Sequence, residues 1–403
     1  MTFIVSHPTG NTFVRALVEE LCQSEQLEYF FTTIGFGENC GKIYYPFKNR
    51  RFYKIPDAKI KRYWYPELLR LFQKGGQEKK RRLVDQIYEK VDLKTSKAIA
   101  VRSVKIIHAY EDGAYQTFRS AKDLGIQCSY ELPIAHWATS RRLLAEEAER
   151  YPEWEPTLES TREPEEKLFL KEEELRLADR ITCPSKFVLD SIPSDIRSRI
   201  PCQISPFGSP IPCIDISFRK HRENLPLQVL FVGSMSQRKG LADLFEAIKL
   251  LRKEPVKLSI LGQPSMPMEF YRKKFPDFEY YPPCTNSKVR EIMKQHDALV
   301  LPSIVEGRAL VQQEALACGV PVIVTRNAGG EDLVDEGKTG HLVPIRSPEK
   351  IAQAIHEMIV NRNLKKEIRI LCQKKATQYT WANYAQKIID FNLSRHLQRI
   401  EIT

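Results

Sequence analysis

Short apolar runs and helix-patterned segments alternate along the first half of the chain. An apolar run at 2–6 is followed by a loop, and residues 13–22 then place apolar side chains at helical spacing. The same order recurs with an apolar run at 104–108 and a helical segment at 115–124. A third apolar run spans 127–132, and a fourth at 180–183 leads into a helix capped by Ser185. This repetition predicts parallel strands joined by helices.

The second half repeats the pattern after a break. Residues 146–177 are highly charged with weak helical periodicity, and residues 201–223 contain four closely spaced prolines, which is typical of an interdomain linker. A new alternation of strands and helices begins at 227. We predict strands at 227–233, 256–261, 298–302 and 321–324, and helices at 241–251, 288–295, 310–317 and 347–360.

These two alternating halves predict an α/β protein with two Rossmann-like domains that face each other. Parallel sheets bind ligands beyond the carboxyl ends of their strands. We therefore expect the ligand in a cleft between the two domains. The predicted boundaries are residues 1–220, with a basic insertion at 42–105, and residues 221–378.

The amino-acid composition restricts the class of protein. The chain has 403 residues, of which 42% are hydrophobic and 28% charged, and no apolar run reaches the ~18–20 residues of a membrane span. The nine cysteines lack C-x-x-C or zinc-finger spacing, which favours reduced thiols over a zinc site. The first residues lack the pattern of a signal peptide. We expect a cytoplasmic protein that is not a polytopic membrane protein.

Charge is concentrated in one segment. Residues 42–105 carry 19 Lys and Arg against 6 Asp and Glu, whereas the whole chain has a net charge of +11. Aromatic residues are interspersed among these cations. Three interpretations stay open: a surface for anionic lipid, a nucleic-acid surface, and a solvated helical insertion with its aromatic rings packed inward. Nucleic acid is the least favoured, because no nucleic-acid-binding fold is predicted.

A loop with two cations opens the second domain's first helix. It reads Gly233-Ser-Met-Ser-Gln-Arg238-Lys239-Gly240, directly after a predicted strand. A helix N-terminus carries partial positive charge and free N–H groups. Arg238 and Lys239 added to that end favour a diphosphate site. The alternative interpretation is an ordinary solvated turn.

Two glutamates lie eight residues apart further on. Glu306 falls in the loop after a predicted strand, and Glu314 falls within the following helix. Gly307 allows backbone to approach a ligand, and the N–H groups of Gly307, Arg308, Ala309 and Leu310 could face a phosphate or sugar oxygen. Glu314 could accept hydrogen bonds from a ribose diol. Spacing alone favours two surface glutamates.

The wider motif resembles glycosyltransferase family 4, the glycosyl transferases group 1. That family carries E-x7-E followed by E-A-x-A-x-G-x-P-V, and here Glu306-x7-Glu314 leads into Glu314-Ala-Leu-Ala-Cys-Gly-Val-Pro-Val322. Residues 329–343 match the family's next signature, and Phe231-Val-Gly233 with Lys239-Gly240 match its phosphate loop. The resemblance covers about 227–360.

This resemblance implies a GT-B fold and a retaining glycosyltransferase, of hexosyltransferase type, that takes a nucleotide-sugar and needs no metal to bind it. Lys239 matches the family's phosphate-binding lysine, Glu314 the ribose-binding glutamate, and Glu306 the glutamate near the donor sugar. Ser234 stands where the family usually has a phosphate-binding arginine, a role that Arg238 could take. Arg308 replaces a residue that is often aromatic or small. The sequence also has no D-x-D motif, which metal-using glycosyltransferases carry.

The first half offers acceptor-side candidates. Gly10 and Asn11 lie in the loop that the family places across the cleft from the donor, and Glu111 follows another predicted strand. The family often has a catalytic histidine after a middle strand, where Pro133 stands here. His136, three residues on, is either the catalytic histidine or a structural one.

We therefore expect a metal-independent glycosyltransferase of carbohydrate biosynthesis with a saccharide, lipid-linked or small-molecule acceptor. No cofactor and no nucleic-acid partner are expected. The alternatives are a nucleotide-binding protein without turnover and a peripheral membrane protein that uses the basic segment on the inner membrane face. The GT-B resemblance also predicts that residues 379–403 form a helix crossing back to the first domain.

Overall fold

Continuous runs of buried apolar residues form the strands of the first domain. The computed structural model describes residues 1–38, 50–52, 54–65, 67, 70, 77–99, 104–158, 162–212, 225–361 and 365–394. Within the first strand, Phe3, Ile4 and Val5 are wholly buried. Such runs suit parallel strands that are covered on both faces. The sheet is parallel throughout, in the order β3-β2-β1-β4-β5-β6-β7. Its strands are β1 Phe3–Ser6, β2 Leu27–Thr32, β3 Ile60–Arg62, β4 Ile106–Tyr110, β5 Gln127–Glu131, β6 Arg180–Cys183 and β7 Cys202–Ile204.

Helices cover both faces of this sheet. One face packs on α1 (Thr12–Gln23) and on the last helix, α15 (Trp381–Leu393). The other face packs on helices that share a second apolar cluster. These are α3 Gln77–Ile99, α4 Tyr115–Asp123, α6 Glu165–Leu177, α7 Lys186–Ser191 and α8 Ser194–Arg197.

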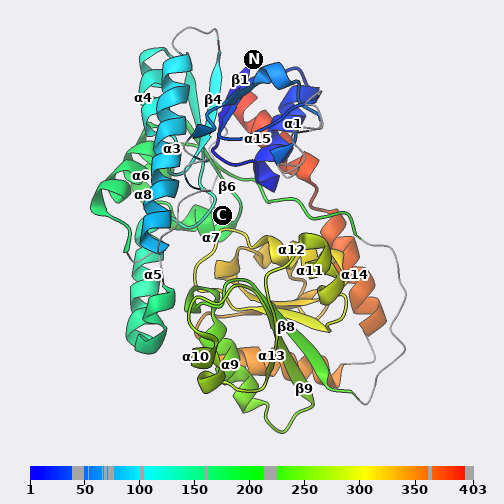
Figure 1. Ribbon diagram of the computed structural model, residues 1–403. Coiled ribbons are helices and arrows are strands. Elements are labelled where there is room, and N and C mark those ends of the chain that lie inside the picture. The colour runs from blue at the N-terminus through cyan, green and yellow to red at the C-terminus, as the bar shows by residue number, and fades with distance from the viewer. Residues whose placement is uncertain are drawn as a thin grey trace.

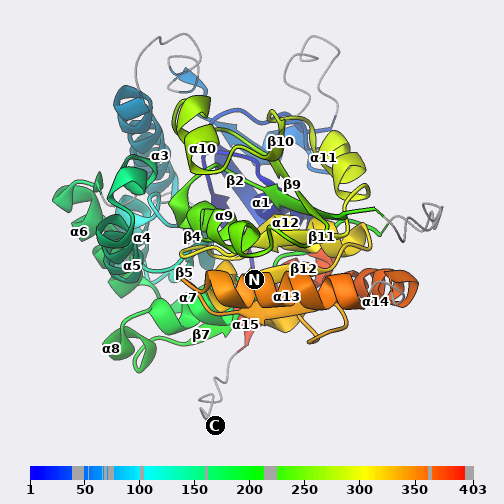
Figure 2. The same ribbon diagram turned by 90° about the horizontal axis from the view of Figure 1, so that it is seen from below.

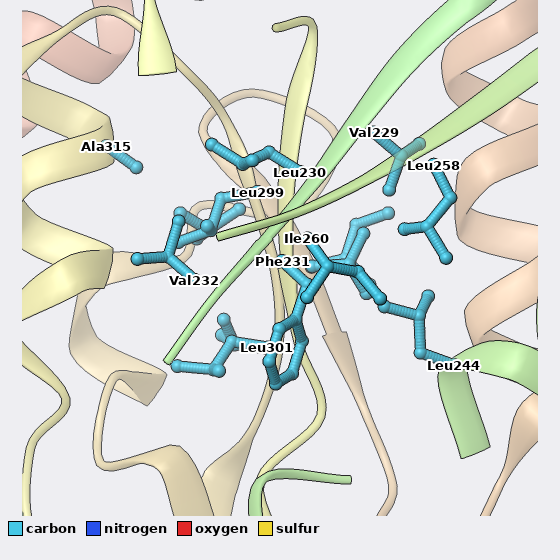
Figure 3. Close-up of a cluster of buried hydrophobic side chains, with 14 of the residues drawn as sticks. Val229, Leu230, Phe231, Val232, Leu244, Leu258, Ile260, Leu299, Leu301 and Ala315 are labelled. Atoms are coloured by element: carbon cyan, nitrogen blue, oxygen red, sulfur yellow. The ribbon is translucent and has the colours of Figure 1, made fainter. Parts of the chain in front are cut away.

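The second domain repeats this construction. Its parallel sheet has the order β10-β9-β8-β11-β12-β13, and side chains of β8, β9 and β11 interlock with those of α9 and α12 (Figure 3). The strands are β8 Leu227–Val232, β9 Val256–Leu261, β10 Phe278–Tyr281, β11 Ala298–Leu301, β12 Val322–Thr325 and β13 Gly340–Val343. The helices are α9 Leu241–Leu250, α10 Met268–Lys274, α11 Asn286–Met293, α12 Leu310–Ala317, α13 Pro348–Val360 and α14 Lys365–Thr377.

Two segments join the domains beyond the linker. Helix α15 leaves the second domain and lies beside α1 in the first (Figure 1), where Tyr384, Ile388 and Ile389 are buried. In the opposite direction, α5 (Trp137–Arg150) and the 3-10 helix η3 (Pro152–Thr157) extend from the first domain along the second (Figure 1). We call residues 137–157 the arm.

The sequence predicts the strands of the second domain's centre closely but misses several outer ones. Strands β2, β3, β7, β10 and β13 are absent from the sequence-based prediction. Four of them, β3, β7, β10 and β13, have four residues or fewer and lie at a sheet edge. The weakly periodic region 146–177 divides into the end of α5, η3 and α6. Pro152 begins η3 and Pro156 lies within it, so the helix cannot continue through this stretch.

The basic segment is only partly described. Tyr44, Tyr45, Phe47 and Tyr53 lie outside the described residues. Phe52 is buried, as an inward-packed insertion requires, whereas the side chains of Trp64 and Tyr65 are 54% and 57% exposed. None of the helices in the described ranges, seen together in Figure 2, has both the length and the hydropathy to cross a membrane.

Candidate donor site

The loop after β8 ends in a tight turn that places two cations side by side. Residues Gln237–Lys239 form one 3-10 turn, and Gly240 follows with a φ of 74°, in the left-handed region that favours glycine. A Cβ on Gly240 would lie 2.1 Å from the Pro302 carbonyl oxygen, so a side chain cannot fit there. The turn leads directly into α9.

Glu306 joins the two cations across the sheet's carboxyl edge. Its carboxylate pairs with the Arg238 guanidinium, and Lys239 Nζ lies 2.5 Å from Glu306 Oε2. Arg238 Nη1 also donates to the Val305 carbonyl at 3.0 Å. The side chains of Lys239 and Glu306 are only 11% and 12% exposed. The three residues, which we call the triad, carry a net charge of +1.

The triad fixes the ionisation of Glu306. Burial alone would raise the pKa of this carboxyl, but the charges and hydrogen bonds of Lys239 and Arg238 outweigh burial and lower the pKa to about 2. Burial lowers the pKa of Lys239, and the Glu306 charge opposes that shift. Glu306 is therefore a carboxylate at neutral pH, held by groups that would equally bind a phosphate oxygen.

The next residue brings the two domains into contact. A Cβ on Gly307 would lie 1.7 Å from the Pro133 carbonyl oxygen of the first domain, so the two backbones touch. Ser185, the N-cap of α7, donates its hydroxyl to the Gly307 carbonyl at 2.6 Å. An apolar cluster that includes Ala135, Ile304 and Val305 surrounds this contact. The triad thus lies where the first domain meets the second.

The backbone amides after Glu306 are not all available to a ligand. The Ala309 N–H donates to the Ala328 carbonyl at 3.1 Å, which corrects the prediction that this amide faces a phosphate or sugar. Leu310 begins α12. Glu314 lies one turn further along this helix and is partly exposed. Burial raises the pKa of Glu314, and Arg290 opposes the shift.

The Arg308 side chain is committed to the interior of the second domain. It is wholly buried, and it donates to Gln313 Oε1 and the Gly329 carbonyl, both at 3.0 Å, and to Asp332 at 2.7 Å. Its guanidinium also lies 4.9 Å from the centre of the Tyr379 ring. Arg308 was predicted among the donor-binding residues through its backbone N–H, which stays a prediction, whereas its side chain has a packing role in the second domain.

His136 has a structural role in this structure. It is the N-cap of α5, where Nδ1 accepts from the Ala138 N–H at 3.4 Å, and Nε2 lies 3.1 Å from Glu172 Oε2. Both ring nitrogens are thus engaged within the first domain, and the residue is 3% exposed. Burial lowers the pKa of His136, and Glu172 opposes the shift. Of the two interpretations left open by the sequence, these contacts favour the structural one.

The loop after β1 is held by packing and capping. A Cβ on Gly10 would lie 2.5 Å from the Phe52 ring, so the ring requires a glycine here. Asn11 is the N-cap of α1 and accepts from the Val14 N–H at 3.3 Å. These contacts account for both residues without a ligand.

Glu111 belongs to a cluster of charges at the end of β4. Lys171 Nζ lies 3.5 Å from Glu111 Oε1, 3.6 Å from Asp112 Oδ1 and 3.2 Å from Glu163 Oε2. Burial raises the pKa of Glu111 to about 7, with Asp112 and Glu163 adding to the rise and Lys171 opposing it. We call Glu111, Asp112, Glu163, Lys167 and Lys171 the acidic cluster.

Sequence reasoning missed the residues that support the turn Gln237–Lys239, which we call the cation turn. Gln237, immediately before Arg238, is wholly buried and bonds to Glu147 and Thr157 of the arm. Its position next to two predicted phosphate ligands was the available signal. In the described parts of the chain, no group of three or more His, Cys, Asp or Glu side chains is arranged to hold a metal.

Comparison with known proteins finds a family match over the second domain. The family model for glycosyl transferases group 1 matches residues 226–361, which include the triad. The D-inositol 3-phosphate glycosyltransferase of Paenarthrobacter aurescens is 26% identical over 199 residues, 45% of this chain and 49% of the relative. The chain therefore spans about half the length of the curated relatives it matches.

Solved structures extend the likeness to both domains. Sucrose-phosphate synthase from Thermosynechococcus elongatus superposes with a TM-score of 0.67 at 17% identity, covering 97% of this chain and 98% of that one. Anabaena Alr3699/HepE, solved in complex with UDP, superposes with a TM-score of 0.60 at 13% identity, covering 97% and 99%. The chain has the GT-B fold, and its residues 226–361 are similar to the glycosyl transferases group 1.

Proposed function

We propose that the chain is a retaining glycosyltransferase that moves a hexose from a nucleotide-sugar to an acceptor. The observation that carries the proposal is the triad. Two cations converge on one carboxylate at the carboxyl edge of the second sheet, beside a contact with the first domain. The family match over residues 226–361 supports the same assignment.

The triad suits a departing diphosphate. During transfer, the bond between the sugar's anomeric carbon and the diphosphate oxygen breaks, and negative charge grows on the diphosphate. Lys239 and Arg238, with the N-terminus of α9 behind them, would stabilise that charge. This arrangement supports donor binding without a metal.

Glu306 has a separate role in the proposal. With a pKa near 2 it stays ionised, so it can accept a hydrogen bond from a donor-sugar hydroxyl and stabilise positive charge on the sugar ring. In a retaining transfer the acceptor oxygen bonds to the anomeric carbon on the face that the diphosphate leaves. The acceptor's proton passes to the released diphosphate.

The test combines ligand binding with product analysis. A thermal-shift panel of nucleoside diphosphates and nucleotide-sugars, with and without EDTA, identifies the donor, because a bound ligand stabilises the folded protein. NMR of the glycoside product then reports the configuration at the anomeric carbon. We expect stabilisation that survives EDTA and a product with retained configuration. Absence of any nucleotide binding, dependence on a metal, or an inverted product would each contradict a stated part of the proposal.

The comparisons suggest where to begin. UDP was bound in the HepE structure, and several relatives are named for D-inositol 3-phosphate. UDP-sugars and phosphorylated polyols are therefore the first donors and acceptors to test, followed by saccharides and lipid-linked acceptors. We place the reaction in the cytoplasm.

A second candidate is nucleotide binding without turnover. The engagement of both His136 ring nitrogens within the first domain favours it, because no other histidine was predicted for the catalytic position. It predicts that Glu306→Gln binds nucleotide as the unaltered chain does and that neither transfers sugar. A transfer rate that Glu306→Gln abolishes would remove this candidate.

Exposed aromatic rings support peripheral association with a membrane. Trp64 and Tyr65 are more than half exposed and lie within four residues of Lys61 and Arg62. Such rings insert at the headgroup level while cations attract anionic lipid. We expect the chain to sediment with vesicles containing phosphatidylserine and not with neutral vesicles, and we expect Trp64→Ser with Tyr65→Ser to weaken that binding. Equal behaviour on both vesicle types would contradict the proposal.

A further inference from the structure

The arm of the first domain is built into the second domain's core. Trp154 is 1% exposed, and its ring centre lies 6.0, 5.0 and 5.8 Å from those of Phe245, Phe270 and Tyr271. Burial of a whole indole among three aromatic rings gives the arm a fixed position on α9 and α10 (Figure 1).

Polar contacts beside Trp154 reach the cation turn. Glu147 of the arm is wholly buried, and its carboxylate accepts from Gln237 Nε2 at 2.7 Å and from Arg346 Nε. Arg346 has a φ of 59°, an uncommon conformation for a residue with a side chain, and its Nη2 also donates to the Leu143 carbonyl of the arm at 3.1 Å. The Glu147 carboxylate is therefore held in place on both sides.

Gln237 uses its polar groups to fix the turn. Its Nε2 also donates to Asp243 at 2.8 Å, and its Oε1 accepts from the Ala242 N–H at 2.9 Å, at the start of α9. Its backbone N–H donates to Thr157 Oγ1 of the arm at 3.1 Å. The residue immediately before Arg238 and Lys239 is thus bonded to the arm through both its backbone and its side chain.

We propose that Glu147, Thr157 and Gln237 are positioning residues that set the geometry of the Arg238–Lys239 turn from the first domain. The expected effect on donor use rests on the proposed function, whereas the expected effect on the geometry of the turn does not. Misplacement of a binding group by about 1 Å can cost a large factor in rate. The donor site of the second domain is therefore completed by the arm.

The test uses the full chain and three variants. Thr157→Val removes the hydroxyl with little change in shape, Thr157→Ser retains it, and Gln237→Met removes the side-chain bonds at similar length. The control is Lys274→Ala, which breaks the 2.6 Å contact with Glu153 of the arm, where both side chains are 30% and 44% exposed. Lys274 touches neither the turn nor the triad in any contact that the structure records.

The first measurement needs no ligand. Hydrogen–deuterium exchange of a peptide spanning residues 234–241 should be about tenfold faster in Thr157→Val and Gln237→Met, and unchanged in Thr157→Ser and Lys274→Ala, because a released loop opens more often. Unchanged exchange in both Thr157→Val and Gln237→Met would overturn the inference whether or not the chain is a glycosyltransferase.

The second measurement separates positioning from folding. With the donor found for the unaltered chain, we expect Thr157→Val and Gln237→Met to raise the donor KM about tenfold, and Thr157→Ser to restore it. A merely structural role would lower the active fraction and leave KM unchanged, and that result would also overturn the inference. If exchange changes as expected and the unaltered chain transfers no sugar, the positioning inference stands and the proposed function fails.

Discussion

Two buried glutamates, one in each domain, are paired with lysine and yet titrate in opposite directions. Glu306 lies between Lys239 and Arg238, and its pKa falls to about 2, although burial opposes the shift. Glu111 pairs with Lys171, but burial and the neighbouring Asp112 and Glu163 raise its pKa to about 7. The ratio of cations to carboxylates decides the direction of the pKa shift. The one carboxylate of the triad has two cations, whereas the three carboxylates of the acidic cluster share two lysines.

This difference separates a site that attracts anions from one that does not. The triad has a surplus of positive charge and can exchange its carboxylate for a phosphate oxygen. The acidic cluster has a surplus of negative charge, and its lysines are already paired with carboxylates. Lysines in the two domains therefore have different expected effects when removed.

The largest effect should follow removal of Lys239. Lys239→Met removes one of the two cations that would stabilise the departing diphosphate, so we expect kcat/KM to fall about 10²–10³-fold. Steady-state kinetics with the identified donor measures this. Circular dichroism of the variant shows whether the fold is retained. An unchanged kcat/KM would contradict the functional difference that we expect between the triad and the acidic cluster.

Removal of Lys171 should act on stability. Lys171→Met leaves Glu111 and Glu163 without their shared cation in a buried setting, and we expect the free energy of unfolding to fall by about 3–5 kcal/mol. Denaturation in urea measures the change. A loss below about 1 kcal/mol would show that the remaining Lys167 suffices for the acidic cluster.

The two glutamates should give opposite pH dependences of stability. The folded pKa of Glu111 is above its ordinary 4.5, so its contribution to stability is present below pH 4.5 and is lost as the pH rises through about 7. The folded pKa of Glu306 is below 4.5, so its contribution is present above pH 4.5 and is lost as the pH falls towards 2.

Variants separate these two contributions. We expect Glu111→Gln to reduce the loss of stability between pH 4.5 and 7, and Glu306→Gln to reduce the loss below pH 4.5. Urea denaturation at pH 3, 4.5, 6 and 7.5 resolves the two windows. The same pH profile in both variants would mean that the two carboxylates do not differ in the way their surroundings imply.

The smallest effect should come from an exposed pair. Lys186 lies 3.0 Å from Asp190, and their side chains are 58% and 49% exposed. Lys186→Ala is expected to change the free energy of unfolding by less than about 1 kcal/mol and kcat/KM not at all. This variant gives the reference against which the effects of replacing Lys239 and Lys171 are judged.

The sequence predicted local features and missed distant ones. Ser185 was expected to cap a helix and does so, because capping depends on residues within one turn. The central strands of the second sheet were also correctly placed by their continuous apolar runs. The pairing of Arg238 with Glu306 joins residues 68 positions apart, and periodicity carries no information about such a contact.

The errors have the same origin. Arg308 was expected to offer its backbone N–H to the donor, and nothing in the local pattern indicated that Gln313 and Asp332 draw its side chain into the domain. Trp154 falls in a charged stretch with weak periodicity, and its burial depends on aromatic rings supplied by the other domain. The roles proposed for Gly10, Asn11 and Glu314 stay predictions.

The arm also sets where this chain can be divided. Trp154 lies in the core of the second domain, whereas Tyr384 of α15 lies in the core of the first, so each domain completes its interior with a segment from the other's side of the linker. A chimera joined at the linker alone would lack buried side chains in the hydrophobic core of each domain. An exchange of donor halves between relatives needs residues 137–157 to travel with the second domain and residues 381–393 to remain with the first.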